Sequence, residues 1–151
     1  MNRCKQLEEN FFVSGQVSRE SLERAMVMGI TRFINNRPDF EEDGQPTHEE
    51  IKGWASELGL EYHFVPVVPG ALTAEVLEQF TGAVSIGEGG CSKGPVMASC
   101  RTGARSCALW ALERASRGAL PVDDIIAAAK AAGYDIAPMK ASLEQLAGFP
   151  G

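Results

Sequence analysis

Apolar and polar residues follow two different periods along this chain, and the two periods alternate. Short, nearly continuous apolar stretches are typical of buried strands, and they occupy residues 11–17, 30–36, 60–68 and 95–99. Amphipathic stretches typical of helices separate and follow them, at residues 18–29, 47–59, 73–87, 102–117, 122–135 and 139–148. This order predicts an α/β fold with a mainly parallel central sheet of about four to five strands, flanked by helices on both faces.

The predicted sheet also predicts where a ligand would bind. In an open parallel sheet the ligand crevice lies beyond the carboxyl ends of the strands, so the loops at 35–45, 69–73 and 100–105 should share one rim. Cys100 ends the last strand and therefore lies on this rim. The first of these loops is acidic, and we expect its carboxylates to serve mainly solvation: Asp39, Glu41, Glu42 and Asp43.

Composition and charge narrow the function classes. The chain has 151 residues, 44% hydrophobic and 23% charged, which suits one globular domain spanning residues 1–151. A net charge of -6 provides no basic patch for nucleic acid or a membrane surface. The N-terminus lacks the apolar core of a signal peptide, and no apolar run approaches the ~18 residues of a membrane span. We therefore expect a cytoplasmic protein without nucleic-acid or membrane partners.

The segment CRTGAR, residues 100–105, carries the candidate chemistry. A cysteine just before a helix N-terminus faces unpaired backbone N–H groups and the positive end of the helix dipole, which favour its thiolate. Arg101 and Arg105 add positive charge, and the forked guanidinium of Arg105 can hold two oxygens of an oxyanion. These features predict that Cys100 is a nucleophile and that Arg105 binds an anion.

The rest of the loop fits an anion-binding nest. Gly103 allows a tight turn, the amides of the loop through Ala104 can point inward, and the hydroxyls of Thr102 and Ser106 can steady a sulfur anion. The alternative is structural, because a cysteine that ends a buried strand is commonly a small core residue. The coincidence of Cys, Gly and Arg at one strand-to-helix junction favours the anion-binding site.

Two further rim residues have open roles. Arg37 can reach over the rim to bind the acidic end of a substrate, with Asp39 orienting it or acting as a general acid. In the structural alternative the two residues pair with each other or cap the chain.

The other cysteines are given no catalytic role. Cys107 is expected to face the interior, Cys4 to lie in a mobile terminus and Cys91 in a loop. Cys4 or Cys91 can resolve an oxidised Cys100, but their spacing does not require it. Four irregularly spaced cysteines fit neither a disulfide scaffold nor a zinc site. No nucleotide or flavin motif is present either, so we predict no metal and no cofactor.

Four segments together resemble a known family. In order, they are FFVSGQVS, GITRFINNRPDFEEDGQP, LGLEYHFVPVVPGALT and GPVMASCRTGARSCALWAL. They are similar to the phosphatase-like domain that precedes the beta-lactamase-hydrolase-like module in some bacterial proteins. The resemblance implies a fold like that of dual-specificity protein tyrosine phosphatases, with Cys100 as the nucleophile and Arg105 as the anion-binding arginine.

The chain departs from the phosphatase pattern in three ways. Those phosphatases have five residues between Cys and Arg, whereas Cys100 and Arg105 enclose four. Their general acid is an Asp in the loop that corresponds to residues 69–73, which here has no carboxylate. Ser99 stands where phosphatases usually have His. The four-residue spacing is similar to the CRxGxRS loop of rhodanese-type sulfurtransferases, whose cysteine carries a persulfide.

Three functional hypotheses follow. The favoured one is a persulfide-forming sulfurtransferase that uses Cys100 as sulfur carrier and acts on a small thiol or a sulfane-sulfur substrate. Its expected partner is a sulfide-oxidation protein. The alternative is a phosphatase that hydrolyses phosphoesters through a phosphocysteine at Cys100. The third is a non-catalytic module that binds anions or senses redox state.

Overall fold

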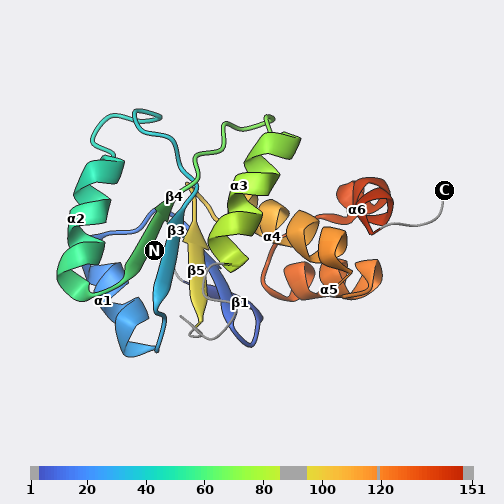
Figure 1. Ribbon diagram of the computed structural model, residues 1–151, viewed down its shortest axis with the longest axis horizontal. Helices are drawn as coiled ribbons and strands as arrows, with labels where there is room; N and C mark the ends of the chain where they lie inside the picture. Colours follow the sequence, from blue (N-terminus) through green and yellow to red (C-terminus); the bar gives the residue numbers. More distant parts are fainter. Residues whose placement is uncertain (1–3, 86–94, 119, 148–151) are drawn as a thin grey trace.

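A computed structural model describes residues 4–85, 95–118 and 120–147 (Figure 1). Its sheet has five strands in the order β1-β2-β5-β3-β4. Their bounds are β1 Lys5–Glu8, β2 Phe11–Ser14, β3 Arg32–Asn35, β4 Glu61–Phe64 and β5 Val96–Ser99. Strands β2, β5, β3 and β4 run parallel, and β1 pairs antiparallel with β2. The predicted α/β fold with a mainly parallel sheet is confirmed.

The helices occur in the expected order between and after the strands. They are α1 Arg19–Val27, α2 His48–Leu58, α3 Ala74–Ser85, α4 Ala104–Arg117, α5 Val122–Ala131 and α6 Lys140–Leu146, with a short 3-10 turn at Ala137–Met139. Ser18 and Thr47 cap α1 and α2 through capping boxes, which satisfy free amides at the helix starts. Gly59, at a φ of 80°, ends α2 in the left-handed conformation that glycine adopts readily.

The helices cover both faces of the sheet. Figure 1 shows α1 and α2 together on one side and α3 to α6 on the other. The α1–α2 side buries a cluster around Leu22, Phe33 and Met97. The larger cluster on the other side includes the fully buried Phe80 and Trp110. Within the described residues, no helix is long and apolar enough to cross a membrane.

Strand β1 is a strand that the apolar pattern did not predict. Its four residues KQLE contain one buried side chain, Leu7, so they show no strong strand signal. The strand forms because β2 supplies an antiparallel partner, an interaction that a local pattern does not reveal. Cys4, just before β1, is half-buried and packs against the α1–α2 cluster, so the prediction that it lies in a mobile terminus is wrong.

The register of the sheet places the predicted rim loops side by side. Ser99 at the end of β5 is level with Ser14 on one neighbouring strand and with Asn35 on the other. Asn35 is in turn level with Phe64 at the end of β4. The loops that follow these four strands therefore begin at one edge of the sheet, and the segment beginning at Cys100 starts in the middle of that edge.

Replacing a core aromatic residue should measure how strongly the fold depends on the α3 to α6 side. Phe80 on α3 is fully buried, and its ring packs edge-to-face on Phe11 at a centroid distance of 6.2 Å. We expect Phe80→Ala to lower the free energy of unfolding in urea by about 3–5 kcal/mol, because it leaves a cavity. Val27→Ala, at a position 87% exposed, is the control and should change stability little. Equal losses in both variants would contradict this packing.

Candidate active site

Cys100 lies at the junction between β5 and α4. Its side chain is buried, with 1% of the residue exposed, and the Gly103 N–H donates a hydrogen bond to Sγ at 3.0 Å. Helix α4 begins at Ala104, two residues later than predicted, with Gly103 as its N-cap at a φ of 97°. Thr102 and Gly103 therefore belong to the loop, and a backbone amide at the helix start contacts the sulfur as the sequence suggested.

Arg105, in the first turn of α4, binds a carboxylate of the chain itself. Its Nη1 donates to Glu41 Oε2 at 2.8 Å and its Nη2 to Glu41 Oε1 at 3.0 Å. Nη1 also donates to the Val67 carbonyl at 2.7 Å. The hydrogen bonds to Glu41 are the main cause of a raised pKa of Arg105, and the charge of Cys100 raises it further. The forked guanidinium of Arg105 thus holds both carboxylate oxygens of Glu41, and its binding of a substrate oxyanion stays a prediction.

Glu41 is shared between two arginines. Arg37, only 3% exposed, donates from Nε to Glu41 Oε1 at 2.9 Å. Its other nitrogens donate to Gln16 Oε1 at 2.8 Å and Glu42 Oε1 at 3.1 Å. The hydrogen bond from Arg105 is the main cause that lowers the pKa of Glu41, and Arg37 contributes. The expectation that this acidic loop serves mainly solvation is wrong for Glu41, whereas the side chain of Glu42 is 55% exposed.

These contacts bear on the two open roles in the rim. Arg37 is buried among Gln16, Glu41 and Glu42, which favours the structural alternative, although its partner is not Asp39. Asp39 Oδ1 accepts a hydrogen bond from the backbone N–H of His48, the first residue of α2, at 2.7 Å. This is the capping role of the structural alternative. A substrate-binding Arg37 and an acid at Asp39 stay predictions.

The hydroxyls of the loop brace it through other partners. Ser106 Oγ donates to the buried Asn36 Oδ1 at 2.8 Å, and Thr102 Oγ1 accepts from the Ala104 N–H at 3.3 Å. The suggested hydroxyl contacts to sulfur are therefore replaced by contacts that hold the loop in shape. Arg101 is mostly exposed, and its Nη2 lies 3.7 Å from Glu42 Oε2.

Four residues of this site were missed or misjudged from the sequence. Gln16 and Asn36 follow the ends of β2 and β3, so the strand-end argument that identified Cys100 also applies to them. Glu41 lies in a loop that was identified, but its partners are distant in sequence. Tyr134, after α5, donates from its hydroxyl to the Thr102 carbonyl at 3.0 Å, and no local pattern points to this contact.

The remaining cysteines differ in their surroundings. Cys107 is fully buried in α4, as predicted, and burial with the nearby charge of Cys100 raises its pKa to about 12. Burial raises the pKa of Cys4 to about 11. Both are poor nucleophiles at neutral pH. Cys91 lies outside the described residues. In the described part of the chain, no group of three or more His, Cys, Asp or Glu side chains is arranged to hold a metal ion.

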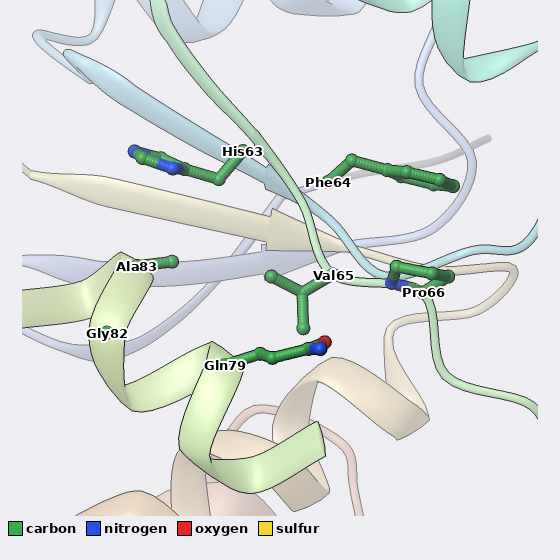
Figure 2. Close-up of a pocket in the computed structure, with 7 residues that line it drawn as sticks. All are labelled: His63, Phe64, Val65, Pro66, Gln79, Gly82 and Ala83. Atoms are coloured by element: carbon green, nitrogen blue, oxygen red, sulfur yellow. The ribbon is translucent and has the colours of Figure 1, made fainter. Parts of the chain in front are cut away.

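A separate hollow of about 660 Å³ lies between β4 and α3. Figure 2 shows Gln79 extending from α3 toward Val65 and Pro66, with His63 on the β4 side. His63 Nε2 lies 2.7 Å from Glu61 Oε2, so a carboxylate already orients its ring. None of the residues that line this hollow belongs to the Cys100 loop, so it is not part of the candidate active site.

Solved structures that this fold resembles include phosphatases and phosphatase-like proteins. A candidate phosphatase from Neisseria meningitidis Z2491 is 35% identical and superposes with a TM-score of 0.78 over 94% of this chain and 96% of its own. Tk-PTP in its active form is 15% identical, with a TM-score of 0.70 and coverage of 95% of each chain. The second likeness shows the fold alone. The resemblance to the protein tyrosine phosphatase fold is confirmed.

Relatives in sequence agree with the structural comparison. The beta-lactamase hydrolase-like protein of Xylella fastidiosa strain 9a5c is 30% identical over 145 residues, 96% of this chain and 32% of the relative. That of Agrobacterium fabrum strain C58 is 30% identical over 143 residues, 95% of this chain and 32% of the relative. The chain thus spans about a third of the length of the curated relatives it matches. Residues 3–117 match the family model of the phosphatase-like domain of beta-lactamase hydrolase-like proteins, and the chain belongs to that family.

Proposed function

We propose that this chain is a cysteine-dependent sulfurtransferase that carries sulfur as a persulfide on Cys100. The observation that carries the proposal is the state of Glu41, the carboxylate that binds the anion-binding arginine. Arg105 and Arg37 hold Glu41 in its ionised form, so it has no proton to give to a leaving group at neutral pH. A reaction at Cys100 that needs no general acid therefore fits this site best.

Sulfur transfer is such a reaction. With thiosulfate as donor, the Cys100 thiolate attacks the outer sulfur, a new S–S bond forms, and sulfite leaves with the electron pair of the broken S–S bond. Cyanide or an acceptor thiolate then attacks the terminal sulfur, and the Cys100 thiolate is released. Neither step requires protonation of the leaving group, because sulfite and thiolates are stable anions.

The loop is suited to the charge changes of this cycle. The Gly103 N–H already donates to Cys100 Sγ, and Arg105 lies close enough to interact with the charge of Cys100. These groups can stabilise the sulfur anion both as attacking and as leaving group. A terminal sulfur also needs less room than a phosphate, which agrees with four rather than five residues between Cys100 and Arg105.

Phosphatase activity is the second candidate, and the descriptions of the family and of a similar solved structure favour it. The family is described as phosphatase-like, and the Neisseria relative is a candidate phosphatase. In this reaction Cys100 attacks phosphorus, an alcohol leaves, and water hydrolyses the phosphocysteine. An alkoxide is a poor leaving group without a proton, so this candidate requires an acid such as Asp39, which now accepts the α2 amide.

Intact mass spectrometry distinguishes the candidates directly. After incubation of the reduced protein with thiosulfate or glutathione persulfide, we expect a gain of about 32 Da that cyanide removes, because one sulfur atom is carried on a thiolate. Cys100→Ser should show no gain, whereas Cys4→Ala should behave like the wild type. Turnover of a phosphoester is measured in parallel with the same variants.

Each other outcome has a definite meaning. Phosphoester turnover that depends on Cys100, with no sulfur adduct, rejects sulfur transfer in favour of phosphatase activity. Oxidation of Cys100 without a cyanide-removable adduct and without phosphoester turnover rejects both enzymes and supports a redox-sensing module.

The ionised state of Glu41 can be tested through stability. Because its pKa in the folded protein is lowered below the ordinary value of 4.5, the pairs with Arg37 and Arg105 stabilise the fold above that value. The stabilisation is lost as pH falls through the lowered pKa. We therefore expect Glu41→Gln to be less stable than the wild type at pH 7, with a difference that shrinks as the pH falls below the ordinary value of 4.5. Urea unfolding across this range measures the difference.

Glu42→Gln is the matched control, since Glu42 is 55% exposed and contacts Arg37 from the same loop. It should show a much smaller difference that depends little on pH. A Glu41→Gln variant with the same stability as the wild type at pH 7 would reject the proposed ionised clamp, and with it the argument against Glu41 as an acid.

A further inference from the structure

Tyr134 reaches the Cys100 loop from a part of the chain that the family model does not cover. It follows α5, beyond the matched residues 3–117. The Gly133 N–H donates to the Lys130 carbonyl at 2.9 Å and the Tyr134 N–H to the Ala129 carbonyl at 2.8 Å. Together with a φ of 102° at Gly133, this is a Schellman motif, which fixes the direction of the chain as it leaves α5.

The Tyr134 hydroxyl packs directly on the active loop. It donates a hydrogen bond to the Thr102 carbonyl at 3.0 Å. A Cβ atom placed on Gly103 would lie 2.1 Å from this hydroxyl oxygen and 3.0 Å from the ring carbon that bears it. Gly103 is therefore required for two reasons, its φ of 97° and the close approach of Tyr134.

The hydroxyl acts on the same peptide group that contacts the sulfur. The Thr102 carbonyl and the Gly103 N–H belong to one trans peptide plane, in which they point in opposite directions. Tyr134 binds the carbonyl at one end, and the N–H at the other end donates to Cys100 Sγ. Rotation of this peptide would break both hydrogen bonds at once, so the first one restrains the second.

We propose that Tyr134 is a positioning residue of the active site: its hydroxyl holds the Thr102–Gly103 peptide so that the Gly103 N–H points at Cys100 Sγ. A hydrogen bond to a peptide carbonyl also polarises the group and strengthens its N–H as a donor. Tyr134 thereby favours the thiolate of Cys100 without touching the substrate. The helical segment after residue 117 contributes this residue to the site.

The hydroxyl remains a hydrogen-bond donor under working conditions. Burial is the main cause that raises the pKa of Tyr134 to about 12, and the charges of Cys107 and Cys100 add to it. The phenol is therefore protonated throughout the neutral range, and its role does not depend on pH there.

The test compares Tyr134→Phe with Tyr62→Phe, because these are the two tyrosines of the chain. Tyr62 is also partly buried with a pKa raised to about 12, but its hydroxyl bonds to Asn35 and His48. The rate of alkylation of Cys100 by iodoacetamide is measured across pH, with peptide mapping to separate it from the other cysteines. Cys100→Ser gives the background.

We expect the midpoint of the pH–rate profile to move up by about one pH unit in Tyr134→Phe, with alkylation slowed about tenfold at pH values well below the wild-type midpoint. Tyr62→Phe should match the wild type. An easier approach of the reagent would change the plateau of the profile and leave its midpoint in place. An unchanged midpoint in Tyr134→Phe, whatever the plateau, would overturn the proposal, and so would an equal shift in Tyr62→Phe.

This inference rests on the proposed use of Cys100 as a nucleophile, but the two can fail separately. Alkylation requires neither a sulfur donor nor a phosphoester, so the effect of Tyr134 is measurable even if no turnover is found. If Tyr134→Phe shifts the profile while no sulfur adduct forms on the wild type, the positioning role stands and sulfur transfer fails. If the adduct forms and the profile does not shift, the positioning role fails alone.

Discussion

The shape of this active site depends on the carboxylate of Glu41, which two arginines share. Arg105 comes from the start of α4 and Arg37 from the loop after β3, and both guanidinium groups are largely buried. Two largely buried cations so close together would repel each other, and nothing would compensate for their lost hydration, unless an anion lay between them. Glu41 supplies that anion and, through Arg105, also connects the rim to the Val67 carbonyl. The loops after β3, β4 and β5 thus hold one another in place.

This clamp affects the chemistry because it favours the ionised form of Glu41 even further than its ordinary pKa of 4.5 does. A carboxylic acid beside Arg105 could protonate a departing alkoxide, whereas a carboxylate fixed by two arginines cannot. The difference matters less for a leaving group that is already a stable anion, such as sulfite or a thiolate. The phosphatase fold and the proposed sulfur chemistry are therefore compatible. The fold supplies the loop and the nucleophile, and the side chains of the rim determine whether a leaving group can be protonated.

The sequence was sufficient to predict the features that depend on local residue patterns or on where the parallel strands end. Apolar periodicity placed the parallel strands and the helices, and the strand-end rule placed Cys100 and Arg105 at the rim. Strand β1 was missed because its polar residues gain their conformation from β2. The acidic loop was misjudged because solvated and clamped carboxylates look alike in a sequence. Only the partner of a carboxylate distinguishes the two cases, and Arg105 lies 64 residues from Glu41 in the sequence.

Gly103 illustrates how one residue can satisfy several constraints of different range. Its tight turn before α4 is a local requirement that the sequence alone suggested, and its positive φ agrees with it. The contact with Tyr134 is a second requirement that arises only when α5 packs on α4 and returns the chain to the loop. An alanine at this position would therefore meet both backbone strain and a collision, and the amide that contacts Cys100 would be displaced by either one.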